Sequence, residues 1–150
     1  MEATIETIYT KPPKMKIYLK TLIKDIGRRE TGRIAAMVFT WCKKNMGVNN
    51  RKGYKPMFYL SAVIDDGQLC GDYDEIDNEI CIYYKNLIDV RELIDTMIHE
   101  WTHQLQPCRT KYNKFKGSYK KHPFEVEAYA SEKIYNSKCW NDIKHKINRS

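Results

Sequence analysis

The sequence has no apolar run that could cross a membrane. Its longest uninterrupted apolar stretch is Ile34–Phe39, whereas a membrane-spanning helix needs about 20 consecutive apolar residues. The N-terminal residues show neither the basic segment nor the apolar segment of a secretory signal. We therefore expect a cytoplasmic protein that makes no contact with a membrane.

Glycine and proline are also scarce, with 7 and 5 residues among 150. This scarcity excludes a collagen-like or Gly/Pro-rich chain, and an apolar content of 42% excludes a disordered one. A chain of this length normally closes around one core. We expect residues 1–150 to form a single domain, with residues 1–13 as a polar leader that ends at Pro12 and Pro13.

The cysteines show no sign of a disulfide framework or of a Cys-rich zinc site. Their number is odd and no CxxC pair occurs; they are Cys42, Cys70, Cys81, Cys108 and Cys139. Secreted disulfide-rich domains have an even number of closely spaced cysteines. Five reduced thiols therefore agree with a cytoplasmic location.

Acidic residues are outnumbered: 19 Asp and Glu face 26 Lys and Arg, which gives a formal net charge of +7. A basic surface attracts nucleic acid, so nucleic acid is one candidate partner. The lysines are spread along the chain, and such scattered charge equally suits an ordinary solvated surface.

The predicted elements define an α+β fold. Helical spacing over residues 14–47, with a break near Gly27, is followed by three β-rich segments, at residues 57–64, 68–73 and 79–84. Asp65-Asp66-Gly67 between the first two is typical of a hairpin turn, so we expect a short antiparallel meander. Two further helices are predicted, one from Asp89 to about Gln106 and one over residues 123–137 with a short helical tail.

The first of these two helices carries an HExxH motif, His99-Glu-Trp-Thr-His103. Two histidines four residues apart lie about 40° from each other on a helix, so both imidazoles can reach one metal ion. Glu100 is offset by about 100° and can take a proton from a water molecule beside the metal. Apolar residues form the opposite stripe of this helix. Two solvated histidines on an ordinary amphipathic helix would show the same stripe.

A carboxylate on the following helix is the expected third ligand. On the helix predicted over residues 123–137, Glu127 lies about 100° from Val126, inside an apolar arc that also includes Ala130 and Ile134. A buried carboxylate needs a cation or a metal. Glu125 falls on the opposite, polar face. The prediction is that His99, His103 and Glu127 bind Zn²⁺ and leave a fourth position open, as in catalytic zinc sites.

Three alternatives remain for the third ligand and its neighbours. Glu127 can instead form a buried salt bridge with a lysine, and Glu125 or His122 can take the ligand position. His122 precedes Pro123, so a position at the helix start in contact with substrate suits it better. Candidates for a donor to the reacting carbonyl oxygen are His122 and three tyrosines, Tyr112, Tyr119 and Tyr129.

These motifs resemble a known class of zinc metallopeptidases. His99-Glu-Trp-Thr-His103, followed by Glu127-Ala-Tyr-Ala130, is similar to the gluzincins, in which a glutamate on a following helix is the third ligand. Residues 71–106 also resemble the SprT-like and ImmA/IrrE-like metallopeptidase domains of bacteria and their phages. The chain lacks the third histidine ligand and the zinc ribbon typical of SprT-like proteins.

The resemblance implies a zincin-like fold and a zinc-dependent endopeptidase with Glu100 as general base. It further implies that an edge strand beside the HExxH helix pairs with an extended peptide substrate. We assign that strand to residues 79–84, with contacts from Ile80, Cys81, Ile82 and Tyr83. For a phage-encoded protein the location would be the host cytoplasm. Two alternative functions are a DNA-associated SprT-like protein and a protease-like regulatory module that recognises one partner.

Overall fold

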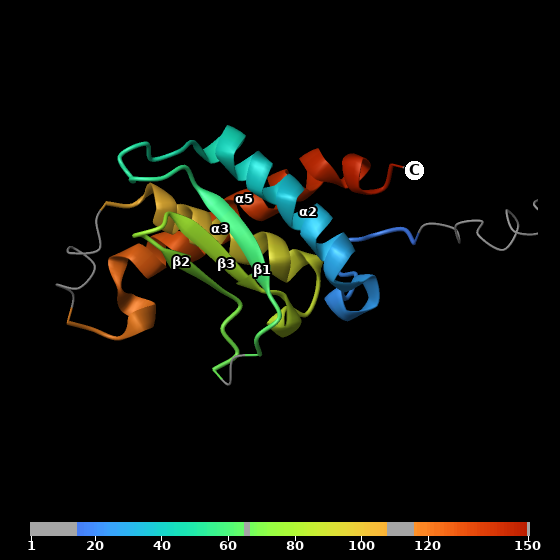
Figure 1. Ribbon diagram of the computed structural model, residues 1–150, viewed down its shortest axis with the longest axis horizontal. Coiled ribbons are helices and arrows are strands. Elements are labelled where there is room, and N and C mark those ends of the chain that lie inside the picture. Colours follow the sequence, from blue (N-terminus) through green and yellow to red (C-terminus); the bar gives the residue numbers. More distant parts are fainter. Residues whose placement is uncertain (1–14, 65–66, 108–115, 150) are drawn as a thin grey trace, which may run out of the picture.

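The computed structural model describes residues 15–64, 67–107 and 116–149. In these ranges the chain forms α2 (Ile23–Met46), β1 (Met57–Ser61), β2 (Gly71–Asp74), β3 (Glu79–Tyr83), η1 (Tyr84–Asn86), α3 (Val90–Leu105), η2 (Tyr119–Lys121) and α5 (Pro123–Ile147) (Figure 1). The predicted α+β class is therefore confirmed. The leader predicted at residues 1–13 lies outside the described residues.

The sheet is mixed, and the prediction of an antiparallel meander is wrong. Its strand order is β1-β3-β2. β1 runs parallel to β3, with Met57 opposite Glu79, and β2 runs antiparallel to β3, with Gly71 opposite Ile82. β3 takes the central position because Ile80, Cys81 and Ile82 are all buried, and a strand buried on both faces belongs inside a sheet. β1 and β2 are therefore not the two arms of a hairpin.

The first helix is shorter than predicted. It begins at Ile23 rather than near Lys14, and the predicted break is confirmed at Gly27, which adopts φ 78° and ψ 176°. A positive φ of this size suits glycine, because other residues meet steric strain there. Trp41 and Val38, farther along α2, are buried in the core.

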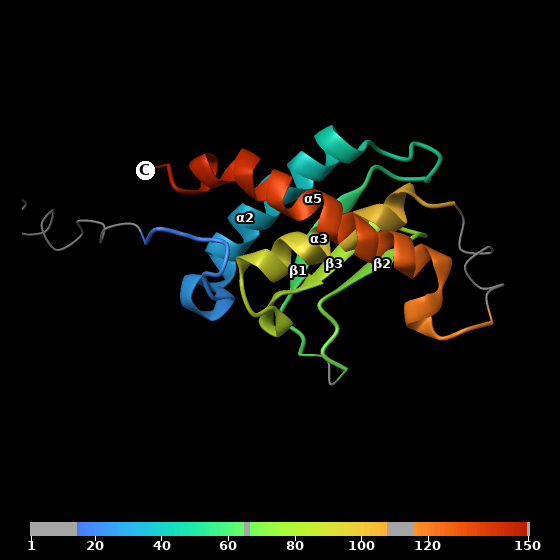
Figure 2. The same ribbon diagram turned by 180° about the vertical axis from the view of Figure 1, so that it is seen from behind.

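Helix α3 lies at the centre of the molecule. It packs against α5 on one side and against β2, β3 and α2 on others. Figure 1 shows the sheet in front of α3, and Figure 2, from behind, shows α5 crossing it. The side chain of Asp89 accepts a hydrogen bond from the Glu92 backbone N–H at 2.9 Å, which confirms the predicted N-cap. The apolar stripe is buried, with Trp101 fully inaccessible.

Helix α5 is one continuous helix to Ile147, longer than the predicted 123–137. Its buried face is not the predicted one. Val126 and Ile134, which defined the predicted apolar arc, are 53% and 66% exposed. Buried residues of this helix include Ala128, Cys139 and Ile143. Among the helices of the described residues, none has both the length and the apolarity that crossing a bilayer demands.

Candidate metal centre

His99 and His103 face α5 from adjacent turns of α3, as the HExxH spacing predicts. Their ring centroids are 5.0 Å apart. His99 is 7% exposed, and His103 is partly buried. Because α5 covers this polar face of α3, the two histidines are not solvated surface residues.

Glu125, not Glu127, meets the two imidazoles. Its Oε1 lies 3.0 Å from His99 Nε2, and its Oε2 lies 3.0 Å from His103 Nε2. Glu125 is 1% exposed, whereas Glu127 is exposed. The predicted burial of Glu127 and the predicted exposure of Glu125 are therefore wrong. One ligand atom from each of His99, His103 and Glu125 lies within 4.8 Å of the others, a group that could hold a metal ion.

The rotation of α5 about its own axis explains why Glu125 is buried and Glu127 is exposed, the reverse of the prediction. Glu125 is 18 residues from the buried Ile143, which is five full turns at 3.6 residues per turn. The two side chains therefore share one face, and small buried residues between them, Ala128 and Ser131, let α5 lie close to α3. This phase becomes visible in the sequence only when the helix is extended to Ile147.

Each imidazole also has an outer partner that the sequence analysis did not identify. His99 Nδ1 lies 2.7 Å from Glu132 Oε2, and His103 Nδ1 lies 2.7 Å from Gln106 Oε1. Partners of this kind orient metal-binding histidines and fix which ring nitrogen carries the proton. Glu132 is seven residues from Glu125 on the same helix, a spacing that could have suggested a shared face.

Charge and burial oppose each other strongly at this centre. Burial lowers the pKa of His99, but hydrogen bonds to Glu125 and Glu132 outweigh it and raise that pKa to about 10. Burial raises the pKa of Glu125, but hydrogen bonds from His103, His99 and Tyr119 hold it well below its usual value. The carboxylate of Glu125 is therefore an ionised acceptor for both imidazoles.

Glu100 is buried beside these groups. It is 7% exposed, and burial raises its pKa to about 7, although the nearby His103 and His99 act in the opposite direction. Strand β2 passes very close to it at Gly71: a Cβ there would lie 3.2 Å from Glu100 Cγ and 2.6 Å from Thr96 Cγ2. A side chain at this position would therefore push the strand away from α3.

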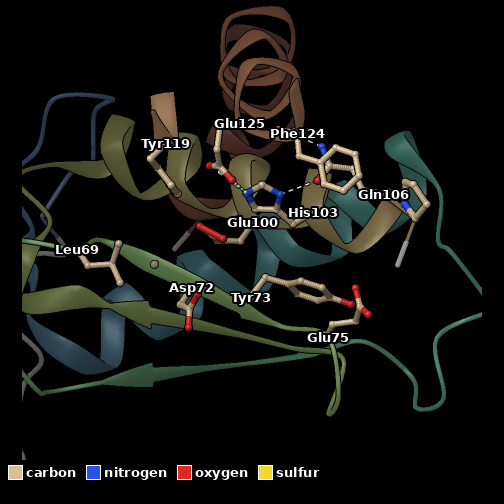
Figure 3. Close-up of a pocket in the computed structure, with 12 residues that line it drawn as sticks. Leu69, Asp72, Tyr73, Glu75, Glu100, His103, Gln106, Tyr119, Phe124 and Glu125 are labelled. Atoms are coloured by element: carbon tan, nitrogen blue, oxygen red, sulfur yellow. Dashed lines mark hydrogen bonds and ion pairs between the residues drawn. The ribbon is translucent and has the colours of Figure 1, made fainter. Parts of the chain in front are cut away.

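A pocket opens in front of Glu100 and His103, between β2 and the start of α5 (Figure 3). Its lining is acidic, with the carboxylates of Asp72, Glu75, Glu100 and Glu125. The pocket borders His103 and Glu125, so a metal bound there would have one side open to it. Tyr119 lines the wall of the same pocket.

The donor set and its spacing suit zinc. Four ligand atoms at about 2 Å from a tetrahedral zinc ion lie roughly 3.3 Å from one another. The Glu125 oxygens lie 3.0 to 3.3 Å from the two Nε2 atoms. Two imidazole nitrogens and one carboxylate oxygen are also ligands that zinc accepts. The distances from Glu125 to the two imidazoles are therefore close to those around a bound zinc ion.

The substrate contacts predicted for β3 and for His122 do not agree with the structure. Ile80, Cys81, Ile82 and Tyr83 lie on the central strand, whose two edges are both paired, and none of them lines the pocket. His122 is 5% exposed, and its Nδ1 accepts a hydrogen bond from the Phe124 backbone N–H at 3.0 Å. It caps α5 instead of facing the pocket.

Comparison with protein-family models, curated proteins and solved structures found no match to this chain.

Proposed function

We propose that this protein is a zinc-dependent metallopeptidase of the gluzincin type. The observation that supports it is the convergence of His99, His103 and Glu125, with Glu100 buried beside them at the wall of a pocket. Structural zinc sites are closed by four protein ligands, whereas catalytic sites have three and an open position. Three ligands next to a pocket favour the catalytic kind.

The proposed reaction is hydrolysis of a peptide bond. A bound zinc ion supplies Lewis-acid chemistry that acidifies water and polarises a carbonyl group. Glu100 takes a proton from the attacking water, whose oxygen bonds to the carbonyl carbon. When the C–N bond breaks, Glu100 delivers that proton to the leaving amine. Its buried position on the pocket wall suits both transfers.

Strand β2 takes the substrate-pairing role that the sequence analysis gave to β3. In the described sheet β2 is an edge strand, and Gly71, Asp72 and Tyr73 line the pocket. An extended peptide can add to such an edge through main-chain hydrogen bonds. The peptide would then lie in the pocket between β2 and the start of α5.

Tyr119 is the best placed of the candidate donors to the carbonyl oxygen. It hydrogen-bonds to Glu125 and lines the pocket. Tyr129 instead packs edge-on against His99, with centroids 4.6 Å apart. His122 caps α5, and Tyr112 lies outside the described residues.

The test combines metal content with peptide cleavage. We expect about one zinc per chain in the parent protein and none in the double variant His99→Ala/His103→Ala. Glu100→Gln should retain zinc but lose cleavage of a fluorogenic peptide library by at least about 100-fold, the usual contribution of a general base. Val126→Ala, a change at an exposed residue next to Glu125, serves as the control and should retain both zinc and cleavage.

Two results would contradict the proposal. One is a zinc-loaded parent protein that cleaves no peptide in the library. The other is a Glu100→Gln variant as active as the parent, which would remove the assigned general base.

A further inference from the structure

The side chain of Gln106 connects the two helices of the metal centre. It is the residue after α3 and is 4% exposed. Its Oε1 lies 2.7 Å from His103 Nδ1, and its Nε2 lies 2.9 Å from the Phe124 backbone oxygen and 2.8 Å from Glu127 Oε1. This one amide group thus contacts His103 on α3 and two residues of α5, Phe124 and Glu127. Phe124 directly precedes Glu125, and Glu127 follows it by two residues.

These contacts fix the orientation of the amide. A backbone carbonyl and a carboxylate are both acceptors, so the NH₂ group of Gln106 must face Phe124 and Glu127. Its oxygen then faces His103, which must donate from Nδ1. The Nε2 atom of His103 is left facing Glu125, where a metal would bind.

We infer that Gln106 is a positioning residue of the metal centre, held in place by Glu127, and that it presents His103 to the metal through Nε2. This inference rests on the proposed metal site. Glu127 then acts at the centre without being a ligand: its exposed carboxylate anchors the Gln106 amide on the side away from His103.

We expect substitutions of Gln106 and of Glu127 to lower zinc affinity to different extents. Gln106→Ala removes the acceptor for His103, and we expect zinc affinity to fall about 10- to 100-fold, as is typical when an outer partner of a metal ligand is lost. Glu127→Ala should cause a smaller loss. Glu127→Gln retains an acceptor oxygen for the Gln106 amide, so its zinc affinity should stay within about threefold of the parent.

Gln104, two residues earlier in the chain and within α3, offers a matched control. It is fully buried, and its amide bonds to the Asn49 backbone through both groups, each at 3.0 Å. Gln104→Ala therefore removes a comparable pair of hydrogen bonds away from the metal ligands. We expect it to lower the unfolding midpoint and to leave zinc affinity within about threefold of the parent, in contrast to Gln106→Ala.

The experiment measures zinc affinity by competition with a chelator and the imidazole tautomers by long-range ¹H–¹⁵N NMR of the zinc-saturated full chain. In the parent protein, His103 should carry its proton on Nδ1; in Gln106→Ala this signal should weaken or split while His99, whose partner is Glu132, stays unchanged. Because Glu127 is exposed, its variants retain the fold and provide a second test if Gln106→Ala does not fold.

Two results would overturn the inference while leaving the zinc site intact. One is a Gln106→Ala variant with parental zinc affinity and an unchanged His103 signal. The other is a Glu127→Gln variant that loses zinc as completely as the double histidine variant, since that would make Glu127 a ligand. A parent protein that binds no zinc would instead refute the proposed function, and this inference with it.

Discussion

The two halves of α5 present one continuous face to two different neighbours. In the N-terminal half, residues 123–132, Glu125 and Glu132 contact His99 of α3. In the C-terminal half, residues 133–147, buried Cys139 and Ile143 belong to the apolar core. The phase of the helix does not change between them. What differs is the neighbour, so the same face carries carboxylates where it meets the histidines and apolar side chains where it meets the core.

Contacts with α2 distinguish the C-terminal half further. Trp41 Nε1 donates to Asp142 Oδ2 at 2.8 Å, and Arg33 donates to the Ile147 backbone oxygen at 2.7 Å. A groove between the two helices here is lined by Arg33, Lys44 and Lys146. We therefore expect substitutions in the first half of α5 to alter the proposed metal binding and substitutions in the second half to alter stability.

The largest expected effect is on metal binding, from a change in the first half. Glu125→Ala removes one of three proposed ligands, so its zinc affinity should fall by more than the ~10–100-fold that follows loss of an outer partner. Affinity is measured by chelator competition at neutral pH. Val126→Ala, a change at the exposed neighbouring residue, should leave affinity unchanged. If Glu125→Ala bound zinc as tightly as the parent, the first half of α5 would not hold the metal, and the proposed difference between the two halves would be wrong.

The next effect is on stability, from a change in the second half. Ile143 is 3% exposed, and Ile143→Ala should cost about 2–4 kcal/mol of unfolding free energy because it leaves a cavity. Ile134→Ala is a matched control on the same helix: this side chain is 66% exposed, so the cost should stay below about 0.5 kcal/mol. Urea unfolding of the zinc-free protein provides the measurement. Equal costs would mean that the helix is rotated from the phase described.

The smallest effect concerns the boundary between the halves, where Asn136 Nδ2 donates to Asp95 Oδ1 at 2.6 Å. Partial burial raises the pKa of Asp95 to about 6; the bond from Asn136 and the charge of Arg91 oppose the rise, and Glu132 and Glu92 add to it. Because this folded-state pKa exceeds the unfolded value, the acid form stabilises the fold, and that contribution is lost as pH rises through 6.

Asp95→Asn retains a neutral acceptor for Asn136, so its stability relative to the parent should increase from pH 4 to pH 8. At this partly buried site we expect at most about 1 kcal/mol after solvent screening. Urea unfolding of both proteins at the two pH values measures the difference. A difference that shrinks as pH rises would contradict the assigned sign.

The sequence was sufficient for α3 because the information there is local. The Asp89 cap, the apolar stripe and the HExxH spacing all lie within one helix, and each was found where it was predicted. The break at Gly27 was likewise predictable from one residue type.

The burial of Glu125 was not predictable from residues 123–137 alone. Val126 and Ile134 are apolar but exposed, so a helix that ends at residue 137 gives a misleading phase. Ile143 and Ile147 carry the correct phase, and they lie beyond the predicted end. The strand order failed for a related reason: β1 pairs with β3 across a connection that contains β2, and no local pattern encodes such a pairing. Gln106 was missed because two of its side chain's three partners, Phe124 and Glu127, come from another helix.

The close approach of β2 to α3 at Gly71 determines which chemical groups the cleft presents there. Because no Cβ fits between β2 and α3 there, the wall opposite Glu100 at this point is bare main chain. At Gly71 the wall therefore offers a peptide only main-chain N–H and C=O groups, whereas the carboxylates of Asp72 and Glu75 line the same pocket beside it. The width of the cleft at this point thus depends on the lack of a side chain at Gly71, and one added methyl group there would alter it.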